Sequence, residues 1–323
     1  MRRSEAKPSR AAVEAPGVKI LVTGATGFIG GRLARRLVDD GFDVRCLTRD
    51  PDSDYSRELA DIGCELAVAD LTRSEVLPEA MDGVSIAYFL VHMIGADDDY
   101  PATELAAARQ FARAATDAGV DRVIYLGGLG DGVGSRHLSS RAAVADALRS
   151  EGPPLTYFRA GMVIGAGSES YALLRGIARR LRALPAPEWL DNETQPIGVD
   201  DVVDYLRAAI DVEESAGREI QIGGPDVASY LELVERMSRA MGESPPRTLR
   251  MSGRIARPRS VAAGAAAVTP GTPAVARELG LGLDQPTVVT DPGGAELFDI
   301  RPRRLDDVLA DAVAAESNGG DGR

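Results

Sequence analysis

A glycine-rich loop constrains the fold of this chain more than any other feature. It follows residues 18–23 (VKILVT), a mainly apolar run typical of a strand that is buried on both faces. The loop itself reads TGATGFIG over residues 23–30, and residues 28–40 continue with the apolar periodicity of a helix. This order of strand, tight loop and helix predicts the first unit of a nucleotide-binding α/β fold.

Each glycine of the loop has its own physical role. Gly24 allows the tight turn, Gly27 lets backbone N–H groups approach a pyrophosphate, and Gly30 lets the helix pack against the strand. The pyrophosphate would then lie at the positive end of the helix dipole. The alternative is a glycine-rich turn without a ligand. The spacing favours a dinucleotide cofactor, with contacts expected from Gly24, Thr26, Gly27, Phe28, Ile29 and Gly30.

Strands and helices alternate after the loop. A helix is expected over residues 102–118, and further strands over residues 43–48, 65–69, 85–91, 122–126 and 155–159. Strands interleaved with helices predict a parallel sheet with helices on both faces. The predicted fold class is therefore α/β, a Rossmann-like doubly wound parallel sheet.

The pattern loosens in the C-terminal half. Helices are expected over residues 171–184, 200–211, 229–241 and 301–316, with extended segments near residues 196–199 and 219–223, while residues 244–275 carry no clear pattern. We therefore predict a small C-terminal substrate-side lobe. The predicted division is a flexible tail (1–17), a core (18–163), a lobe interleaved with the core (164–313) and a frayed tail (314–323).

The end of the second strand bears on cofactor choice. Sites that prefer NAD usually carry an acidic residue there to hold the ribose 2′-hydroxyl, whereas an arginine accommodates a 2′-phosphate. Here Thr48 occupies that place and Arg49 follows, with Arg32 on the first helix as a possible second charge. The sequence therefore predicts that NADP(H) is preferred and that NAD(H) is possible; the alternative is that both arginines are solvated.

Composition removes several classes of function. Lys7 and Lys19 are the only lysines, so no later residue can form a Schiff base or complete a Walker-A loop or a Tyr-x-x-x-Lys pair. The net charge of −12 argues against nucleic acid as a partner, and two cysteines with two histidines leave no structural zinc site. We therefore expect no metal. The sequence has no long apolar run and no apolar leader, so we also expect no membrane span and a cytoplasmic location.

At this point the motifs are recognisable. They are the loop at 23–30, the Arg49 turn, Ala69-Asp70-Leu71 and the YLGGLG segment at 125–130. These resemble the atypical short-chain dehydrogenase/reductases, most closely the NmrA-like NAD(P)H-binding branch, which is also similar to the 39-kilodalton accessory subunit of complex I. The resemblance implies that Asp70 and Leu71 contact the adenine and that Leu90 and Val91 line the cofactor channel.

The chain departs from the catalytic pattern of that superfamily. Its catalytic members use a serine at the end of the fifth strand and a Tyr-x-x-x-Lys pair on the next helix, where this chain has Gly127-Gly128, His137 and Arg141. His137 and Arg141 share a helical face at i and i+4, so the histidine could protonate a carbonyl oxygen in place of the tyrosine. Alternatively, His137 is an ordinary polar residue near the helix start.

Two further side chains are candidates for the site. Tyr171 stands one turn before Arg175, which could lower the pKa of the tyrosine; alternatively Tyr171 only shapes the pocket. His92 closes the fourth strand, where it either touches the nicotinamide ribose or caps the strand. The candidate catalytic residues are therefore His137, Arg141 and Tyr171.

Two functions remain open from the sequence. One is an NADPH-dependent oxidoreductase acting on a small carbonyl or quinone-like substrate with a non-standard proton donor. The other is a non-catalytic NADPH-binding redox sensor or accessory subunit with a protein partner. The absent serine, tyrosine and lysine favour the second, while residues 167–171 and 195–197, which resemble a substrate pocket, favour the first.

Overall fold

The first strand, β1 (Lys19–Val22), is an interior strand of a sheet and supplies core residues to both of its faces. Ile20 and Val22 pack into one apolar cluster and Leu21 into another, as the alternation of a strand requires. The structure is a computed structural model and describes residues 17–93, 99–130, 135–252 and 285–318. The predicted tail at residues 1–17 lies outside this part of the chain except for Gly17.

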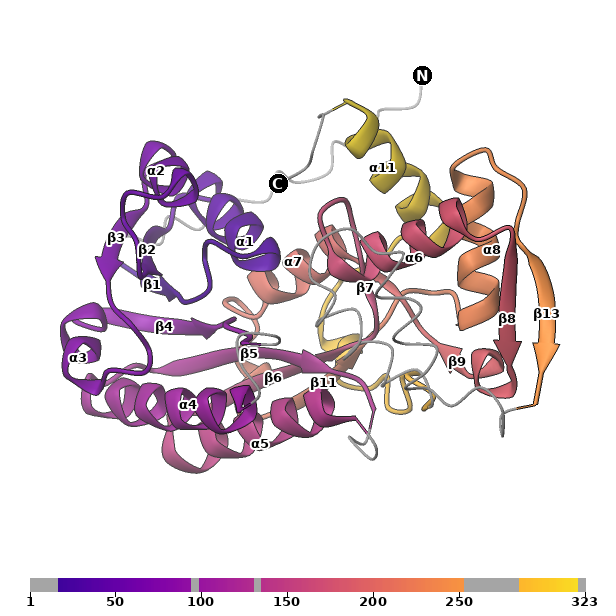
Figure 1. Cartoon of the computed structure of the whole chain (residues 1–323). Coiled ribbons are helices and arrows are strands. Elements are labelled where there is room, and N and C mark those ends of the chain that lie inside the picture. Colours follow the sequence, from indigo (N-terminus) through magenta and orange to yellow (C-terminus); the bar gives the residue numbers. More distant parts are fainter. Residues whose placement is uncertain (1–16, 94–98, 131–134, 253–284, 319–323) are drawn as a thin grey trace, which may run out of the picture.

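Within the described residues, the central sheet has seven strands in the order β11-β6-β5-β4-β1-β2-β3, and all neighbours are parallel. The order reverses at β1, as in a doubly wound fold (Figure 1), so the predicted fold class is confirmed. The other strands are β2 (Asp43–Thr48), β3 (Glu65–Val68), β4 (Val84–Phe89), β5 (Arg122–Gly128), β6 (Leu155–Ala160) and β11 (Glu219–Ile222).

Helices cover both faces of this sheet. One face carries α1 (Phe28–Asp39), α2 (Asp54–Asp61) and α7 (Val199–Ala208). The opposite face carries α3 (Leu77–Ala80), α4 (Tyr100–Asp117) and α5 (Arg136–Glu151), with α4 and α5 packed side by side (Figure 1). Parallel strands covered on both sides in this way are buried, which explains their mainly apolar sequences.

A third apolar cluster forms the predicted C-terminal lobe, on the right in Figure 1. It is built around α6 (Glu169–Arg180), α8 (Tyr230–Ala240) and α11 (Leu305–Asn318). Within the residues that the structure describes, short 3-10 helices lie at Ser74–Val76, Glu188–Asp191, Glu213–Ser215 and Ala295–Leu297. The short strands of the lobe region are β7 (Val163–Ile164), β8 (Ala183–Pro187), β9 (Glu193–Thr194), β10 (Ile197–Gly198), β12 (Ala228–Ser229) and β13 (Arg247–Met251).

Several elements differ from those expected. The helix expected over residues 171–184 ends at Arg180, and β8 begins three residues later. The segment near 219–223 is not isolated but is β11, the edge strand beside β6. The tail expected to fray from residue 314 continues α11 to Asn318, because Glu316 pairs with Arg175 of α6 at 2.7 Å.

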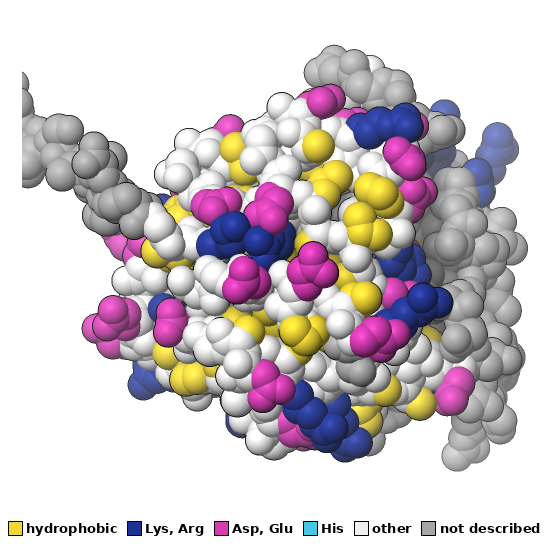
Figure 2. Space-filling view, turned by 90° about the vertical axis from the view of Figure 1, so that its left-hand side faces the viewer, with side chains coloured by type: hydrophobic (Ala, Val, Ile, Leu, Met, Phe, Trp, Pro, Cys, Tyr) yellow, Lys and Arg dark blue, Asp and Glu magenta, His cyan; other side chains and the backbone are white. Residues whose placement is uncertain are grey.

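The surface around β3 mixes charges of both signs. Lys19 pairs with Asp43 and Glu65, and Figure 2 shows the Lys and Arg side chains of this face lying among Asp and Glu. None of the helices in the described parts of the chain has the length and apolarity needed to cross a membrane. The absence of a nucleic-acid partner and the cytoplasmic location stay predictions.

Candidate functional site

The glycine loop forms the turn that its spacing predicts. Gly24 has a φ of +68°, and a Cβ atom at this position would lie 2.6 Å from the Leu90 carbonyl oxygen at the end of β4. The Gly27 N–H donates to the Gly24 carbonyl oxygen at 2.9 Å and closes the turn. Only glycine combines this positive φ with so close an approach to a neighbouring backbone.

The loop leaves the start of α1 open. A Cβ atom on Gly30 would lie 2.2 Å from the Gly24 carbonyl oxygen, so Gly30 holds the helix against the turn. Gly27 is the N-cap of α1, and no side chain caps the helix there; Thr26 and Gly27 are both exposed. Unpaired N–H groups and the positive end of the helix dipole therefore face outward, which fits the pyrophosphate of a dinucleotide.

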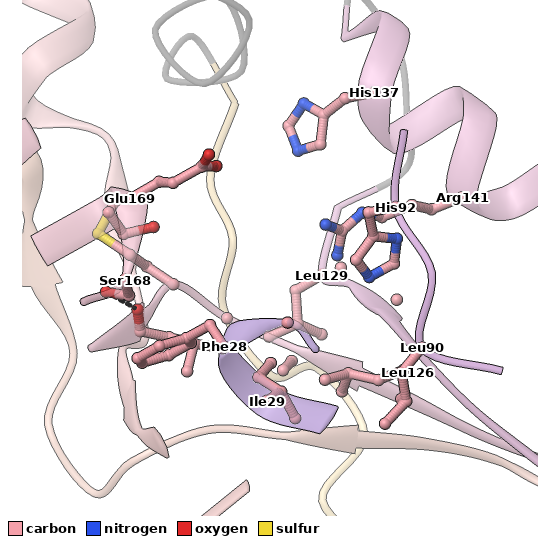
Figure 3. A pocket seen from close by; sticks show the side chains of 18 of the residues that line it. Phe28, Ile29, Leu90, His92, Leu126, Leu129, His137, Arg141, Ser168 and Glu169 are labelled. Carbon is pink, nitrogen blue, oxygen red and sulfur yellow. Dashed lines mark hydrogen bonds between the residues drawn. The ribbon is translucent and has the colours of Figure 1, made fainter. Parts of the chain in front are cut away.

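A cavity of about 490 Å³ begins at this loop. Phe28, Ile29 and Leu90 line its near end, and its wall continues along the end of β5 to α5 and α6. Figure 3 shows Phe28 and Ile29 at the helix start, His92, His137 and Arg141 on one side and Ser168 and Glu169 on the other. The cavity thus joins the glycine loop to a polar wall that carries titratable groups.

The residues expected at the adenine and the 2′-phosphate are not among those that line this cavity, and neither is Val91, which was expected to line the cofactor channel. Arg49 is exposed and, within the described residues, makes no hydrogen bond or ion pair. Asp70 accepts hydrogen bonds from the Thr72 N–H at 2.9 Å and hydroxyl at 2.8 Å, which together with Arg49 lower its pKa. Leu71 is buried in the core, so only its backbone is available to a ligand, and Val91 is half-buried.

The suggestion that Arg32 adds a second charge for a 2′-phosphate stays a prediction, and in the structure its guanidinium has partners within the protein. Its guanidinium donates to the carbonyl oxygens of Phe28 at 2.8 Å and Ala166 at 3.1 Å. It also lies 4.2 Å from the centroid of the Phe28 ring. Arg32 therefore ties α1 to the loop before α6, and Arg49 is the more available candidate for cofactor choice.

His137 and Arg141 both line the cavity from α5, as their spacing predicts. Ser135, the N-cap of this helix, accepts the Leu138 N–H, and its hydroxyl lies 3.0 Å from His137 Nδ1. The serine hydroxyl proton can then be donated to Nδ1, which leaves the proton of the neutral imidazole on Nε2. Burial, and second the Arg141 charge, lower the pKa of His137 to about 3. The helical spacing of the two residues accounts only for the Arg141 contribution, which is the smaller cause.

Arg141 lines the site and has one unsatisfied polar atom. Its Nε is buried and has no hydrogen-bond partner among the described residues. Buried polar groups without partners are uncommon in folded proteins and can mark a place that a ligand completes. The Tyr125 hydroxyl donates to the Arg141 backbone carbonyl at 3.4 Å and not to the guanidinium.

His92 joins this wall from the end of β4. Its Nδ1 lies 3.4 Å from Glu104 Oε1, and the other oxygen of Glu104 accepts the Ser140 hydroxyl at 2.7 Å. The carboxylate is buried, with 2% of the residue exposed. Burial and then Arg141 lower the pKa of His92, while Glu104 opposes them. The sequence offered His92 only as a ribose contact or a strand cap and missed Glu104.

A signal for Glu104 was present in the sequence. Residues 104, 108, 111 and 115 fall on one stripe of the helix, and the last three are apolar. A single carboxylate on an otherwise apolar stripe indicates a buried charge that needs a partner.

The described residues contain no group of three or more His, Cys, Asp or Glu arranged to hold a metal.

The place of the missing serine is filled by a tyrosine ring. A Cβ atom on Gly127 would lie 2.7 Å from the Tyr157 hydroxyl oxygen, and one on Gly128 would lie 2.6 Å from Leu138. Tyr157 itself stacks on Tyr125 with ring centroids 5.3 Å apart. Neither glycine can therefore become a serine unless its neighbour moves.

The expectation that Tyr171 acts in the pocket is wrong. Residues 167–170 line the cavity, but Tyr171 is buried in the apolar cluster of the lobe, and its hydroxyl donates to Glu316 at 2.9 Å. Burial, followed by Glu316, raises its pKa, so Arg175 does not activate it. Gln195 is likewise structural, since its side chain bonds to Gly224 and Val289.

Comparisons with known proteins agree with this architecture. Ceramide reductase of Caulobacter vibrioides is 31% identical over 179 residues, 54% of this chain and 55% of that protein. Subunit 9 of the NADH dehydrogenase [ubiquinone] 1 alpha subcomplex of Arabidopsis thaliana mitochondria is 27% identical over 240 residues, 71% of this chain and 59% of the subunit. Such matches to curated relatives cover between 20% and 59% of those proteins' own length.

A solved structure and a family profile complete the comparison. Triphenylmethane reductase of Citrobacter sp., solved in complex with NADP(H), shares the fold at a TM-score of 0.70 and 18% identity, covering 91% of this chain and 99% of the reductase. The profile of the NmrA-like family matches residues 17–249. That match extends from the first strand through the lobe to β13, so the chain belongs to the NmrA-like family, as its motifs predicted.

Proposed function

We propose that this protein is an NADPH-dependent oxidoreductase that reduces a small carbonyl or quinone-like substrate. The observation that carries the proposal is the cavity, which runs from the glycine loop to a wall of two histidines and an arginine. Bound NADPH supplies a hydride at its nicotinamide ring. A reductase must also stabilise the charge that develops on the substrate oxygen and then protonate that oxygen.

His137 and Arg141 are suited to stabilising the charge that develops on the substrate oxygen. Arg141 lines the cavity, and its guanidinium carries several N–H donors in a fixed geometry. His137 is neutral at neutral pH and holds its Nε2 proton through the contact with Ser135. Together the two side chains offer hydrogen-bond donors and one positive charge to a substrate oxygen.

The preference for NADPH is assigned to Arg49. Its guanidinium is exposed beside the second strand and free to pair with a 2′-phosphate. A charge-assisted hydrogen bond of about 1.5–3 kcal/mol predicts that Arg49→Ala weakens NADPH binding about ten- to hundred-fold, with the lower end favoured at an exposed site. Titration with NADH is the internal control, because NADH lacks the phosphate and its affinity should not change. An equal loss for both cofactors would contradict the assignment.

A second function has its own support. Tyr157 fills the place of the superfamily's serine, and one relative is a subunit of a mitochondrial NADH dehydrogenase. A chain that binds NADPH without turnover would act as a redox sensor or accessory subunit and would present the bound state to a protein partner.

One experiment separates the two functions. NADPH oxidation is followed by the loss of its absorbance with a panel of quinones, aldehydes and ketones, beside a direct titration of NADPH binding. Turnover with any member of the panel supports the oxidoreductase. Tight NADPH binding without turnover on the whole panel supports the sensor and removes the oxidoreductase.

A further inference from the structure

Glu104 is a carboxylate in a place where a charge is costly. It lies on the inward stripe of α4 beside Ala107, Ala108 and Phe111, which are fully buried. A buried ionised group is tolerated only when it is paired or fully hydrogen-bonded. The proposed function assigns Glu104 no task, and neither do the comparisons.

Both oxygens of Glu104 have partners, and each partner comes from a different element. Oε2 accepts the hydroxyl proton of Ser140 on α5 at 2.7 Å, while Oε1 lies 3.4 Å from Nδ1 of His92 at the end of β4. An ionised carboxylate can only accept, so the Nδ1 proton is the one that faces it. Nε2 is then the imidazole nitrogen that remains for a ligand in the cavity, which His92 lines.

We propose that His92 is the proton donor of the reductase and that Glu104 is the positioning residue that orients and charges it. The inference rests on the proposed function. Bound NADPH would supply the hydride, with its nicotinamide C–H bond broken and NADP⁺ left behind. As the carbonyl carbon gains that hydride, the π electron pair of the C=O bond moves to oxygen. The oxygen takes the Nε2 proton, the electrons of the N–H bond stay on nitrogen, and the imidazole regains a proton from solvent. An arrangement in which a carboxylate fixes one imidazole nitrogen while the other transfers a proton is well suited to this task.

The charged surroundings of His92 differ from those of His137. Burial is the largest effect that lowers the pKa of His92, and Arg141 and His137 on α5 also oppose its imidazolium. Glu104 on α4 stabilises that imidazolium, and Tyr125 on β5 contributes a ring 6.5 Å away. His137 has a serine hydroxyl as its hydrogen-bond partner and no carboxylate among the described residues. His92 is therefore the histidine whose imidazolium is in contact with a carboxylate, and His137 the one that donates a hydrogen bond while neutral.

The pairing can be tested without cofactor or turnover, on the full chain. His92 and His137 are the only histidines, so imidazole nitrogen and carbon signals can be assigned by NMR with one substitution. We expect His92 to carry its neutral proton on Nδ1. We also expect Glu104→Gln to lower the protonation constant of His92 about ten- to hundred-fold. Glu151→Gln is the matched control, since Glu151 also links α4 and α5 but pairs with Arg109 and Arg113. A neutral proton on Nε2 in the wild type, or an unchanged constant in Glu104→Gln, would overturn the proposal.

Steady-state kinetics test the proton transfer itself. We expect kcat to rise as the pH falls toward the pKa of His92, and Glu104→Gln to move this limb to lower pH. His92→Gln should lose about 10²- to 10⁴-fold in kcat while NADPH still binds. This variant tests the proposal even if Glu104→Gln does not fold. Wild-type kcat in His92→Gln overturns the proton donor and leaves the reductase standing. Absence of turnover in the wild type across the panel overturns the proposed function, and the role of His92 falls with it.

Discussion

Gly27→Val is expected to abolish binding of the nicotinamide dinucleotide while the chain stays folded. Gly27 is exposed, its φ of −90° suits any residue, and the nearest atom to a new Cβ is the Gly24 carbonyl oxygen at 3.1 Å. The fold can therefore accept the valine after a small adjustment. The side chain, however, would stand in front of the open N-terminus of α1, where the pyrophosphate must meet backbone N–H groups. Loss of two charge-assisted hydrogen bonds corresponds to a weakening of about 10²- to 10⁴-fold.

The measurement is a fluorescence titration with NADPH beside a thermal melt. Gly27→Ala is the graded control, because its methyl group covers less of the helix start and should weaken binding less. Gly30→Val is the structural control, since its Cβ would lie 2.2 Å from a backbone oxygen and should destabilise the chain itself. Wild-type affinity in a folded Gly27→Val protein would show that the loop does not hold the cofactor.

The parts of the fold that the sequence predicted are those set by local pattern. The strand, glycine loop and first helix follow from apolar runs and glycine spacing within about twenty residues, and the structure confirms them. Helix α2 was missed because its buried residues are only Ser56 and Leu59, too few for a periodic apolar signal. Strand β11 was seen only as an extended segment, because its place in the sheet depends on β6, about sixty residues earlier.

In the candidate site too, local spacing predicts the place of some residues, and tertiary contacts decide the place of others. His137 and Arg141 lie on one face of α5 because helical spacing alone fixes that relation. Tyr171 and Arg175 share a face too, but Glu316, 145 residues after Tyr171, pairs with both and takes them into the packing of the lobe. The contact between His92 and Glu104 depends on how α4 packs beside β4, which no local pattern encodes. Tertiary partners therefore decide which of the polar residues face the cavity.

His137→Ala is expected to lower kcat about 10²- to 10³-fold and to leave NADPH affinity nearly intact. This is the usual cost of removing one hydrogen-bond donor from a developing oxyanion, and the residue lies on α5, away from the glycine loop. Because the pKa of His137 is about 3, the imidazole is neutral throughout the neutral range, and its contribution to kcat should not vary with pH there. Pre-steady-state hydride transfer measured across that range tests both points.

Tyr171→Phe is the control variant for His137→Ala. The substitution removes the hydrogen bond to Glu316 and should cost about 1 kcal/mol of stability. Turnover should barely change, because the hydroxyl belongs to the contact between α6 and α11 and not to the cavity. Full activity in His137→Ala together with loss of activity in Tyr171→Phe would reverse the two roles. A loss in His137→Ala that grows steadily across the neutral range would instead mean that His137 is charged in the reaction. Burial beside the permanent charge of Arg141 argues against that charge, because both destabilise an imidazolium more than they destabilise a neutral ring.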